Sequence, residues 1–402
     1  MALNQKGNNS IIIDSPSLYF HIPFCEKKCI YCDFYSVAKV ELINQYINSI
    51  IKEIDLKTDL FLSETSQIAH NNLINYKLSP KSIYLGGGTP SILNIEQISL
   101  IVNKIKEKFN FNQLEEFTIE VNPNSVDLSK LSAYLDLGIN RLSIGVQSLN
   151  SKELKFLGRI HTPEQAIKSI QLAKEAGFTN ISCDIIYSIP KQNISSIKHT
   201  IDELIKLNIQ HISAYTLIFE EGTPLFNKYI KGEIIPNRDS KEEILFLEIC
   251  DYLNKNNFKQ YEISNFAKDN FQSKHNLNYW RKGEYLGFGA SAHSYFNNQR
   301  IKNYSNVEKY CDLISSNKLA IEFKEVLTKE QNFIEAIYLG LRAEGIDFEE
   351  IKNDFNIDLL TTKSYLIEYL LKEKKANLIG TKLALNSSGY ALCDYLTTQF
   401  IG

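Results

Sequence analysis

Residues 19–34 read YFHIPFCEKKCIYCDF, a stretch that joins an apolar strand pattern to a cluster of three cysteines. Cys25, Cys29 and Cys32 follow the spacing C-x3-C-x2-C at the end of an apolar run over residues 18–24. We expect the run to form a buried strand, with the cysteines on the loop that follows it. This stretch therefore predicts a metal-binding loop at the end of the first strand of a sheet.

Three thiols so close together suit either of two metal centres. Thiolates are soft ligands that bind zinc and iron–sulfur clusters, but a structural zinc site is closed by four ligands. Position 34 is Phe34, and the nearest other candidate ligand, His21, precedes Pro23 in the strand. Three protein ligands on a four-iron cluster leave one iron open to a substrate or cofactor. We therefore interpret the loop as a [4Fe–4S] site, with structural zinc or free thiols as the alternative.

The rest of the composition describes an ordinary globular chain. It has 402 residues, of which 44% are hydrophobic and 23% charged, which predicts two or three folded domains. The net charge of −3 gives no basic surplus for nucleic acid or an anionic membrane. Residues 1–10 lack the apolar core of a signal peptide, and no apolar run is long enough to span a membrane. We expect a soluble cytoplasmic protein.

Cysteine use supports the same compartment. The total of seven is odd, which argues against a framework of disulfides. Four cysteines lie apart from the cluster and are expected to be ordinary buried thiols: Cys183, Cys250, Cys311 and Cys393.

The first half of the chain alternates strand-like and helix-like segments. The strand-like runs are residues 18–24, 82–85, 117–121, 141–146, 181–189 and 211–219. The helical patterns between them are residues 40–62, 95–109, 128–137, 163–176 and 194–207. Alternation of this kind predicts an α/β fold with a parallel sheet, either a full or partial (β/α) barrel or an open doubly wound sheet.

The alternation stops near residue 235. Residues 242–254 form an amphipathic helical pattern, and residues 261–295 are interpreted as extended structure and loops. Helical patterns then occupy residues 328–341, 347–355 and 359–372, before a short strand at 383–385. We expect three parts: a core barrel over 10–235, a smaller mixed connecting region over 236–322, and a helical, winged-helix-like domain over 323–402.

Polar residues follow the predicted strands at one edge of the sheet, where active sites assemble in parallel α/β folds. Gly86-Gly87-Gly88-Thr89-Pro90 follows the second strand. Glu120, Gln147 and Asp184 lie in or at the end of the next three, and Arg159 is a candidate carboxylate partner. A polar side chain in an apolar strand is costly unless it is paired. We interpret the set as contacts to one polar ligand, with separate structural hydrogen bonds as the alternative.

The cysteine spacing, with an aromatic residue before the last cysteine, resembles the signature of radical S-adenosylmethionine (SAM) enzymes. The resemblance implies a [4Fe–4S] cluster held by Cys25, Cys29 and Cys32. It also implies SAM chelated to the open iron and cleaved by one electron to methionine and a 5′-deoxyadenosyl radical. The glycine turn resembles the superfamily's contact with the SAM amino group.

The order of these motifs resembles the coproporphyrinogen dehydrogenase-like group of radical SAM proteins over nearly the whole chain. The resemblance implies a partial barrel of about six strands. It also implies SAM contacts at Tyr19, Gly87, Gly88, Thr89, Glu120, Gln147, Arg159 and Asp184.

Two features separate the branches of this group. The coproporphyrinogen dehydrogenases extend the motif with a C-x-C cysteine, where this chain has Phe34. The HemW-type heme chaperones carry H-N-x-x-Y-W, which is present here at residues 275–280. The segments 285–289 and 292–294 also look like that branch. The resemblance implies a heme chaperone, and oxygen-independent coproporphyrinogen III oxidase is the alternative; a radical SAM enzyme with another substrate is a third.

His275 is the residue we expect to ligate heme, because imidazole is a common axial ligand. Tyr279 and Trp280, the chain's single tryptophan, offer apolar surface for a porphyrin. A hydrogen-bonded structural role for His275 is the alternative, and His293 is a second candidate ligand. His21, His161 and His211 are interpreted as structural or as lining the cofactor site.

The branch implies an acceptor protein that receives the heme and allows transient contact with a membrane protein; no motif specifies the acceptor or an oligomeric state. The chain departs from the branch in two loops. Ser188-Ile189-Pro190-Lys191 stands where glycine is usual near Leu-Pro, and Ala290-Ser291 replaces a pair that ends in glycine. Both changes affect loop backbone rather than the cluster.

Overall fold

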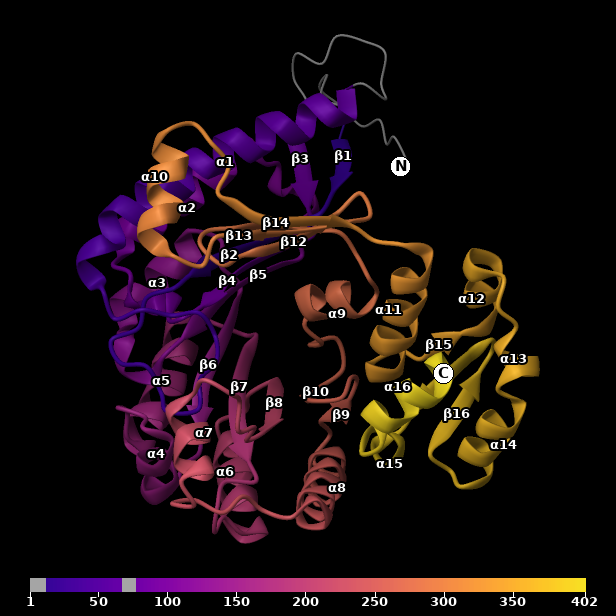
Figure 1. Cartoon of the computed structure of the whole chain (residues 1–402). Helices are drawn as coiled ribbons and strands as arrows, with labels where there is room; N and C mark the ends of the chain where they lie inside the picture. Colours follow the sequence, from indigo (N-terminus) through magenta and orange to yellow (C-terminus); the bar gives the residue numbers. More distant parts are fainter. Residues whose placement is uncertain (1–11, 67–76) are drawn as a thin grey trace. The chain divides into compact units, whose positions relative to one another are not determined.

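The computed structural model describes residues 12–66 and 77–402, and the chain divides into two compact units. The first comprises Met1–Gly145, Lys168–Thr179 and Glu284–Val326, and the second comprises Val146–Ile167, Asn180–Gly283 and Leu327–Gly402. Each unit thus gathers segments that are far apart in the sequence (Figure 1). Residues 10, 11 and 67–76 of the expected core domain lie outside the described residues.

A mixed sheet lies in the first unit, in the order β14-β13-β12-β11-β2-β4-β5-β6. The run from β11 through β2, β4 and β5 to β6 is parallel, whereas β11 to β14 pair antiparallel. The strands are β2 (Ser17–Ile22), β4 (Ser82–Gly87), β5 (Glu116–Val121), β6 (Arg141–Gln147), β11 (Tyr285–Phe288), β12 (His293–Phe296), β13 (Gln299–Asn303) and β14 (Ile321–Val326). A separate parallel pair joins β1 (Ile12–Ser15) to β3 (Lys77–Pro80).

The helices of this unit pack on the sheet through apolar stripes. α2 shows why they form: a capping box of Asn94 and Gln97 begins it, and four buried apolar side chains at helical spacing face inward. α1 packs against α2 and α10. The helices and short 3-10 turns are η1 (Val40–Leu42), α1 (Ile43–Ser66), η2 (Pro90–Ile92), α2 (Ile95–Lys108), η3 (Phe111–Gln113), η4 (Pro123–Ser125), α3 (Leu128–Asp136) and α10 (Val307–Ser315).

The two faces of this sheet differ in chemistry. Successive side chains of a strand point to opposite faces, so β2 places Leu18 and Phe20 on one face and Tyr19 and His21 on the other. The register extends both faces across the sheet, with Leu18 opposite Ile83 of β4. On the parallel strands β2, β4 and β5 the first face is buried and forms the core. The second face, which we call the polar face, carries Tyr19 and His21 and is the place to look for a site.

The strand order decides between the two architectures that the sequence allows. β2, β4, β5 and β6 follow one another across the sheet without reversal, as do β7 (Ile181–Tyr187) and β8 (His211–Thr216) in the second unit. A doubly wound sheet reverses its strand order at a switch point, whereas a barrel winds in one direction. The order is therefore that of (β/α) barrel winding, and the expected α/β fold is confirmed.

In the second unit β8 continues antiparallel to β10 (Asn265–Ala267) and then β9 (Lys259–Gln260). Its helices are α4 (Ser151–Leu157), α6 (Ile194–Lys206), α7 (Pro224–Ile230), α8 (Asp239–Lys255) and α9 (Lys274–Trp280). α5 (Pro163–Ala176) contributes residues to both units.

The end of the second unit is a small group of helices around a three-stranded antiparallel sheet, drawn in yellow tones in Figure 1. The sheet has the order β15-β17-β16, with β15 (Ile346–Asp347), β16 (Ala376–Ile379) and β17 (Lys382–Leu385). The helices are α11 (Lys329–Arg342), α12 (Phe348–Phe355), α13 (Leu359–Thr362), α14 (Ser364–Lys372), α15 (Ser387–Tyr390) and α16 (Cys393–Ile401). Helices are present over the expected residues 328–341 and 347–355, and the expected helix over 359–372 is divided into α13 and α14. The winged-helix likeness stays a prediction.

The six expected strands and the helices between them are confirmed, but one expectation is wrong. Residues 261–295 were expected to be extended or looped, whereas residues 274–280 form α9. Ser273 caps this helix by accepting a hydrogen bond from the Asn276 amide at 3.3 Å. Seven residues are too few for an apolar period to stand out, which explains the error. Among the described residues, no helix is both long and apolar enough to cross a membrane.

Candidate functional site

On the polar face of the first unit, the described side chains form a connected set of hydrogen bonds. The Tyr19 hydroxyl lies 3.0 Å from Nδ1 of His21, and Nε2 of His21 lies 2.9 Å from the Tyr35 carbonyl oxygen. Burial lowers the pKa of His21 to about 4, so its imidazole is neutral at neutral pH. Both ring nitrogens are therefore occupied, and His21 is not available as a fourth zinc ligand.

Glu120 anchors the glycine turn from the neighbouring strand. Its carboxylate accepts a hydrogen bond from the Tyr84 hydroxyl at 2.9 Å and another from the Gly87 amide at 3.0 Å. Burial, and then the charge of Glu120, raise the pKa of the Tyr19 phenol. Sequence reasoning missed Tyr84, although the period of two in β4 places it on the same face as Tyr19.

The glycine turn lies tightly against the start of the cysteine loop. A Cβ atom on Gly87 would lie 2.8 Å from the His21 ring, and one on Gly88 would lie 2.8 Å from the Phe24 carbonyl oxygen. The Gly88 amide donates to the Ile22 carbonyl oxygen at 2.8 Å. Gly87 also has a φ of +115°, a conformation that favours glycine. The turn is thus a cradle that only glycine fits.

The three clustered cysteines lie on the loop after β2, and all are partly exposed. Phe24 bridges to Val37, which closes the loop, and Cys25 Sγ lies 3.4 Å from the Thr89 hydroxyl beside the glycine turn. Burial raises the pKa of Cys32 to about 11, and the nearby Cys29 and Cys25 also act to raise this pKa. The three sulfurs therefore share one neighbourhood, next to the glycine cradle.

The donor set fits a cluster better than a single ion. Around zinc, three thiolates would each lie about 2.3 Å from one atom. Among the described residues, no group of three His, Cys, Asp or Glu side chains is gathered in that way. Three partly exposed thiols beside a glycine cradle suit a larger group whose metal atoms each take one thiolate.

The division between the units falls within β6, so Gln147 at the end of this strand belongs to the second unit, where it sits in a strained turn. Its φ is +64°, and the Ser148 amide donates to the Val146 carbonyl oxygen at 2.8 Å across it, which makes a γ-turn of the rare positive-φ kind. Nε2 of His161 lies 3.1 Å from the same carbonyl oxygen, and Arg159 Nε lies 3.4 Å from His161 Nδ1. Burial, and then Arg159, lower the pKa of His161 to about 4. Such strain at a strand end is a feature of functional sites.

Asp184 is the one half-buried side chain in β7, between fully buried neighbours. The sequence-predicted SAM contacts thus fall into two sets. The first unit holds Tyr19, Gly87, Gly88, Thr89 and Glu120, and the second unit holds Gln147, Arg159 and Asp184.

His275, the expected heme ligand, lies in α9 with only 1% of its surface exposed. Its Nε2 atom is 2.9 Å from the hydroxyl of Tyr279, one helical turn further on, and the two rings meet edge to face. His275 therefore has a structural partner in this state of the chain.

Phe34, in contrast, has 65% of its surface exposed beside the cysteine loop.

Comparisons with known proteins agree with this geometry. Residues 19–204 match the model of the radical SAM superfamily. The chain is 36% identical to the heme chaperone HemW of Lactococcus lactis over 387 residues, which cover 96% of this chain and 97% of that protein. It is 34% identical to the heme chaperone HemW of Bacillus subtilis, over 81% of this chain and 83% of that protein.

A solved structure shows the same fold. Coproporphyrinogen III oxidase (HemN) from Escherichia coli superposes with a TM-score of 0.79 at 22% identity, over 96% of this chain and 90% of that chain. The fold and the cysteine loop thus define a radical SAM protein, a class that uses a [4Fe–4S] cluster and SAM. Within that class, the chain belongs to the HemW family.

Proposed function

We propose that this chain is a heme chaperone that binds heme together with a SAM-ligated [4Fe–4S] cluster and delivers the heme to an acceptor protein. The observation that carries the proposal is the similarity to heme chaperones along 96% of the chain. Phe34 supports it, because the related enzymes place a further cysteine where this chain exposes an aromatic ring.

Cys25, Cys29 and Cys32 would hold the cluster, since they are the thiols that the loop brings together. When bound and reduced by an outside electron donor, the cluster would offer an open iron for SAM and the electron for its cleavage. The Phe24–Val37 bridge fixes the base of the loop, and Thr89 lies against Cys25. These contacts tie the loop to Val37 and to the glycine turn.

The polar face would hold SAM in the first unit through Tyr19, Gly87, Gly88, Thr89 and Glu120. The glycine cradle lets a ligand approach the backbone. Glu120 holds the Gly87 amide of the cradle in place by accepting its hydrogen bond. Glu120 also provides negative charge near the position that the superfamily uses for the SAM amino group.

Gln147, Arg159 and Asp184 are the proposed contacts in the second unit. The γ-turn places Gln147 at the end of β6, and His161 contacts both that turn and the Arg159 guanidinium. Arg159 offers a cation for a carboxylate, and Asp184 offers an acceptor for hydroxyl groups.

Delivery can be tested directly. The heme-loaded, cluster-reconstituted chain is mixed anaerobically with an apoprotein that binds heme, and transfer is followed by absorbance. We expect heme to move from the chain to the apoprotein. A chain that takes up no heme, or that never releases it, would contradict the proposal.

Oxygen-independent coproporphyrinogen III oxidase is the alternative, because the HemN structure shares the fold. Incubation with coproporphyrinogen III, SAM and an electron donor decides between the two. We expect no protoporphyrinogen, and a Phe34→Cys variant tests whether the missing cysteine alone accounts for that. We also propose a cytoplasmic location, with transient contact to a membrane protein as one route of delivery and no nucleic-acid partner.

A further inference from the structure

The antiparallel end of the first unit's sheet carries side chains that the proposed SAM and cluster contacts do not use. Its register places His293 of β12 opposite Lys302 of β13, which lies opposite Phe323 of β14. Directly opposed residues share a face, with Cβ atoms about 5 Å apart. The imidazole of His293, the ammonium of Lys302 and the ring of Phe323 therefore form a row across three strands.

A second row runs beside the first on the same face. Tyr285 of β11 lies opposite Tyr295 of β12, which lies opposite Arg300 of β13. Arg300 acts on both phenols, since its charge lowers the pKa of Tyr285 and of Tyr295 against the larger effect of burial, which raises them. The two rows together form a patch, which we call the His293 patch.

The His293 patch continues the polar face that carries Tyr19 and His21. Tyr285 pairs with Ser17, and Gly287 pairs with Tyr19, in the parallel register of β11 and β2. The charge of His293 also contributes to the lowered pKa of His21. The patch therefore lies along the sheet from the predicted SAM contacts, within one unit.

The exposed imidazole of His293 lacks the kind of hydrogen bond that the buried imidazoles of the described residues make. The rings of His21, His161, His211 and His275 all make hydrogen bonds. Within the described residues, no group hydrogen-bonds to the exposed ring of His293. Burial first, and then Lys302 and Arg300, lower the pKa of its imidazole, with Glu322 acting in the opposite direction. A neutral ring with a free nitrogen can ligate iron.

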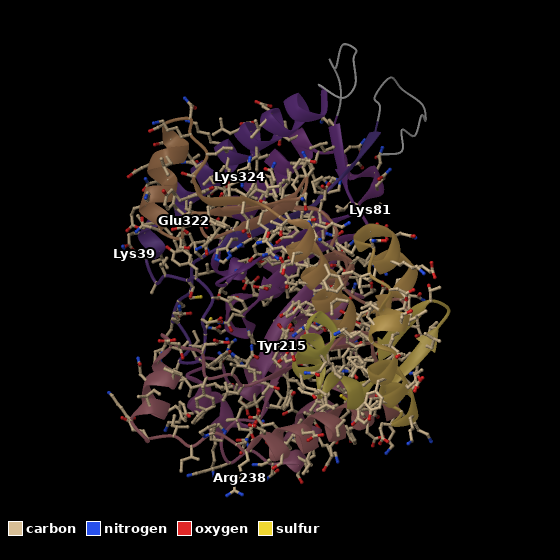
Figure 2. All side chains as sticks on the ribbon, turned by 45° about the vertical axis from the view of Figure 1, so that its right-hand side comes forward. Lys39, Lys81, Tyr215, Arg238, Glu322 and Lys324 are labelled. Atoms are coloured by element: carbon tan, nitrogen blue, oxygen red, sulfur yellow. The ribbon has the colours of Figure 1, made fainter. Side chains whose placement is uncertain are left out.

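The two cations of the patch form ion pairs with acidic side chains of the edge strand. Lys302 pairs with Glu322 at 2.8 Å and Arg300 with Glu325 at 3.7 Å, both at partly exposed positions on the edge strand. Such pairs are worth about 0–1 kcal/mol, so an incoming carboxylate can replace them. Phe323 has 48% of its surface exposed between Glu322 and Lys324, and the latter two are labelled in Figure 2.

The backbone around His293 is held rigidly. A Cβ atom on Gly287 would lie 2.0 Å from the His293 carbonyl oxygen, so only glycine allows β12 to lie there. Lys57 Nζ donates to the Gly287 carbonyl oxygen at 2.5 Å, and Glu53 accepts from the Gly289 amide at 2.7 Å. These two buried residues also form an ion pair at 2.8 Å. A rigid support of this kind suits a binding site.

We propose that the His293 patch is the heme-binding surface, with His293 as the axial ligand to iron, Arg300 and Lys302 as partners of the propionates, and Tyr295 and Phe323 against the macrocycle. This inference rests on the proposed function and names its heme site. It differs from the sequence prediction, which places the ligand at His275. The buried ring of His275 is hydrogen-bonded to the Tyr279 hydroxyl. Ligation of iron by His275 would therefore first require α9 to open.

Absorbance titration with heme tests the assignment on the full, cluster-reconstituted chain. We expect His293→Ala to weaken heme binding by about tenfold or more and to change the visible spectrum, whereas His275→Ala leaves both unchanged. Added imidazole should restore the spectrum of His293→Ala. Titration with metal-free protoporphyrin separates the roles: His293→Ala should bind it like the unaltered chain, and Arg300→Gln with Lys302→Gln should bind it more weakly.

Lys324→Gln is the matched control, because Lys324 lies on the same edge strand opposite Ile301, away from the patch. It should bind both porphyrins normally. Unchanged heme affinity in His293→Ala, or a loss confined to His275→Ala, would overturn this inference and leave the chaperone function standing. An unaltered chain that binds no heme would overturn both.

Discussion

The Tyr279 hydroxyl lies 2.9 Å from Nε2 of His275, and the two residues are one turn apart in α9. This spacing puts both rings on one side of the helix. His275, the histidine that stands out most in the sequence, is thus paired with another residue of the same short helix. The motif that marks the family, which contains His275, is therefore not part of the surface that we propose binds heme.

Replacement of Tyr279 by Phe removes this hydrogen bond and keeps the ring. We expect a loss of about 1 kcal/mol in the free energy of unfolding, because the buried His275 nitrogen loses its partner. Heme affinity should not change. Urea denaturation and heme titration check the two parts, with the exposed Tyr365→Phe as control. A large loss of heme affinity would place the pair in the heme site.

Substitution of Gly87 by Ala should abolish cluster assembly and SAM binding. The new methyl group would meet the His21 ring at 2.8 Å. Gly138→Ala is the matched control, since Gly138 also has a positive φ, of +93°, but open space around it. Both variants should lose about 1–2 kcal/mol of stability from backbone strain. Iron content and visible absorbance should fall only in Gly87→Ala; equal iron content in both would refute the cradle.

Glu262 predicts a pH effect on stability. Its side chain is fully buried, and burial raises its pKa from 4.5 to about 7. The folded chain therefore holds this proton more tightly than the unfolded chain. The stability that results is present below about pH 4.5 and is lost as the pH rises to about 7, by about 3 kcal/mol in total.

Urea denaturation of the unaltered chain and of Glu262→Gln isolates this effect. His21 and His161, with pKa values of about 4, add stability as the pH rises toward 6.5, but they do so in both proteins. From pH 5 to pH 8 the unaltered chain should lose stability relative to Glu262→Gln. Parallel pH profiles would show that Glu262 is ionised in the folded chain.

Ser291→Gly should stabilise the chain. Ser291 has a φ of +66°, which costs a residue with a side chain about 1–2 kcal/mol. After the entropy of the added glycine, we expect a gain of about 0.5 kcal/mol by thermal or urea denaturation. Ser132→Gly, in the interior of helix α3, should instead destabilise. If Ser291→Gly also destabilises, its hydrogen bond from Ser305 outweighs the strain.

The sequence predicts the barrel well because its strands are buried runs and its helices carry long apolar stripes. The polar face is also predictable, since Tyr19 and Glu120 stand out in apolar strands. The departures from the family pattern fall on backbone of positive φ, at Ser188, Lys191 and Ser291. At Ser188, a hydrogen bond to Glu242 at 2.6 Å accompanies that conformation.

Other features depend on tertiary contacts that no local pattern shows. The burial of His275 depends on how α9 packs, and a seven-residue helix has no clear period. The His293 patch depends on the register of three short strands, with a bulge between Lys302 and Asn303. Sequence reasoning named His293 as a candidate, but only the register shows which cations and rings share its face.

Heme titration of the anaerobically reconstituted chain, with and without SAM and read by absorbance, tests the central claim most directly. The account predicts saturable binding of heme, with the spectrum of an imidazole-ligated iron that His293→Ala loses. Absence of saturable binding under both conditions would contradict the claim that this member of the HemW family is a heme chaperone.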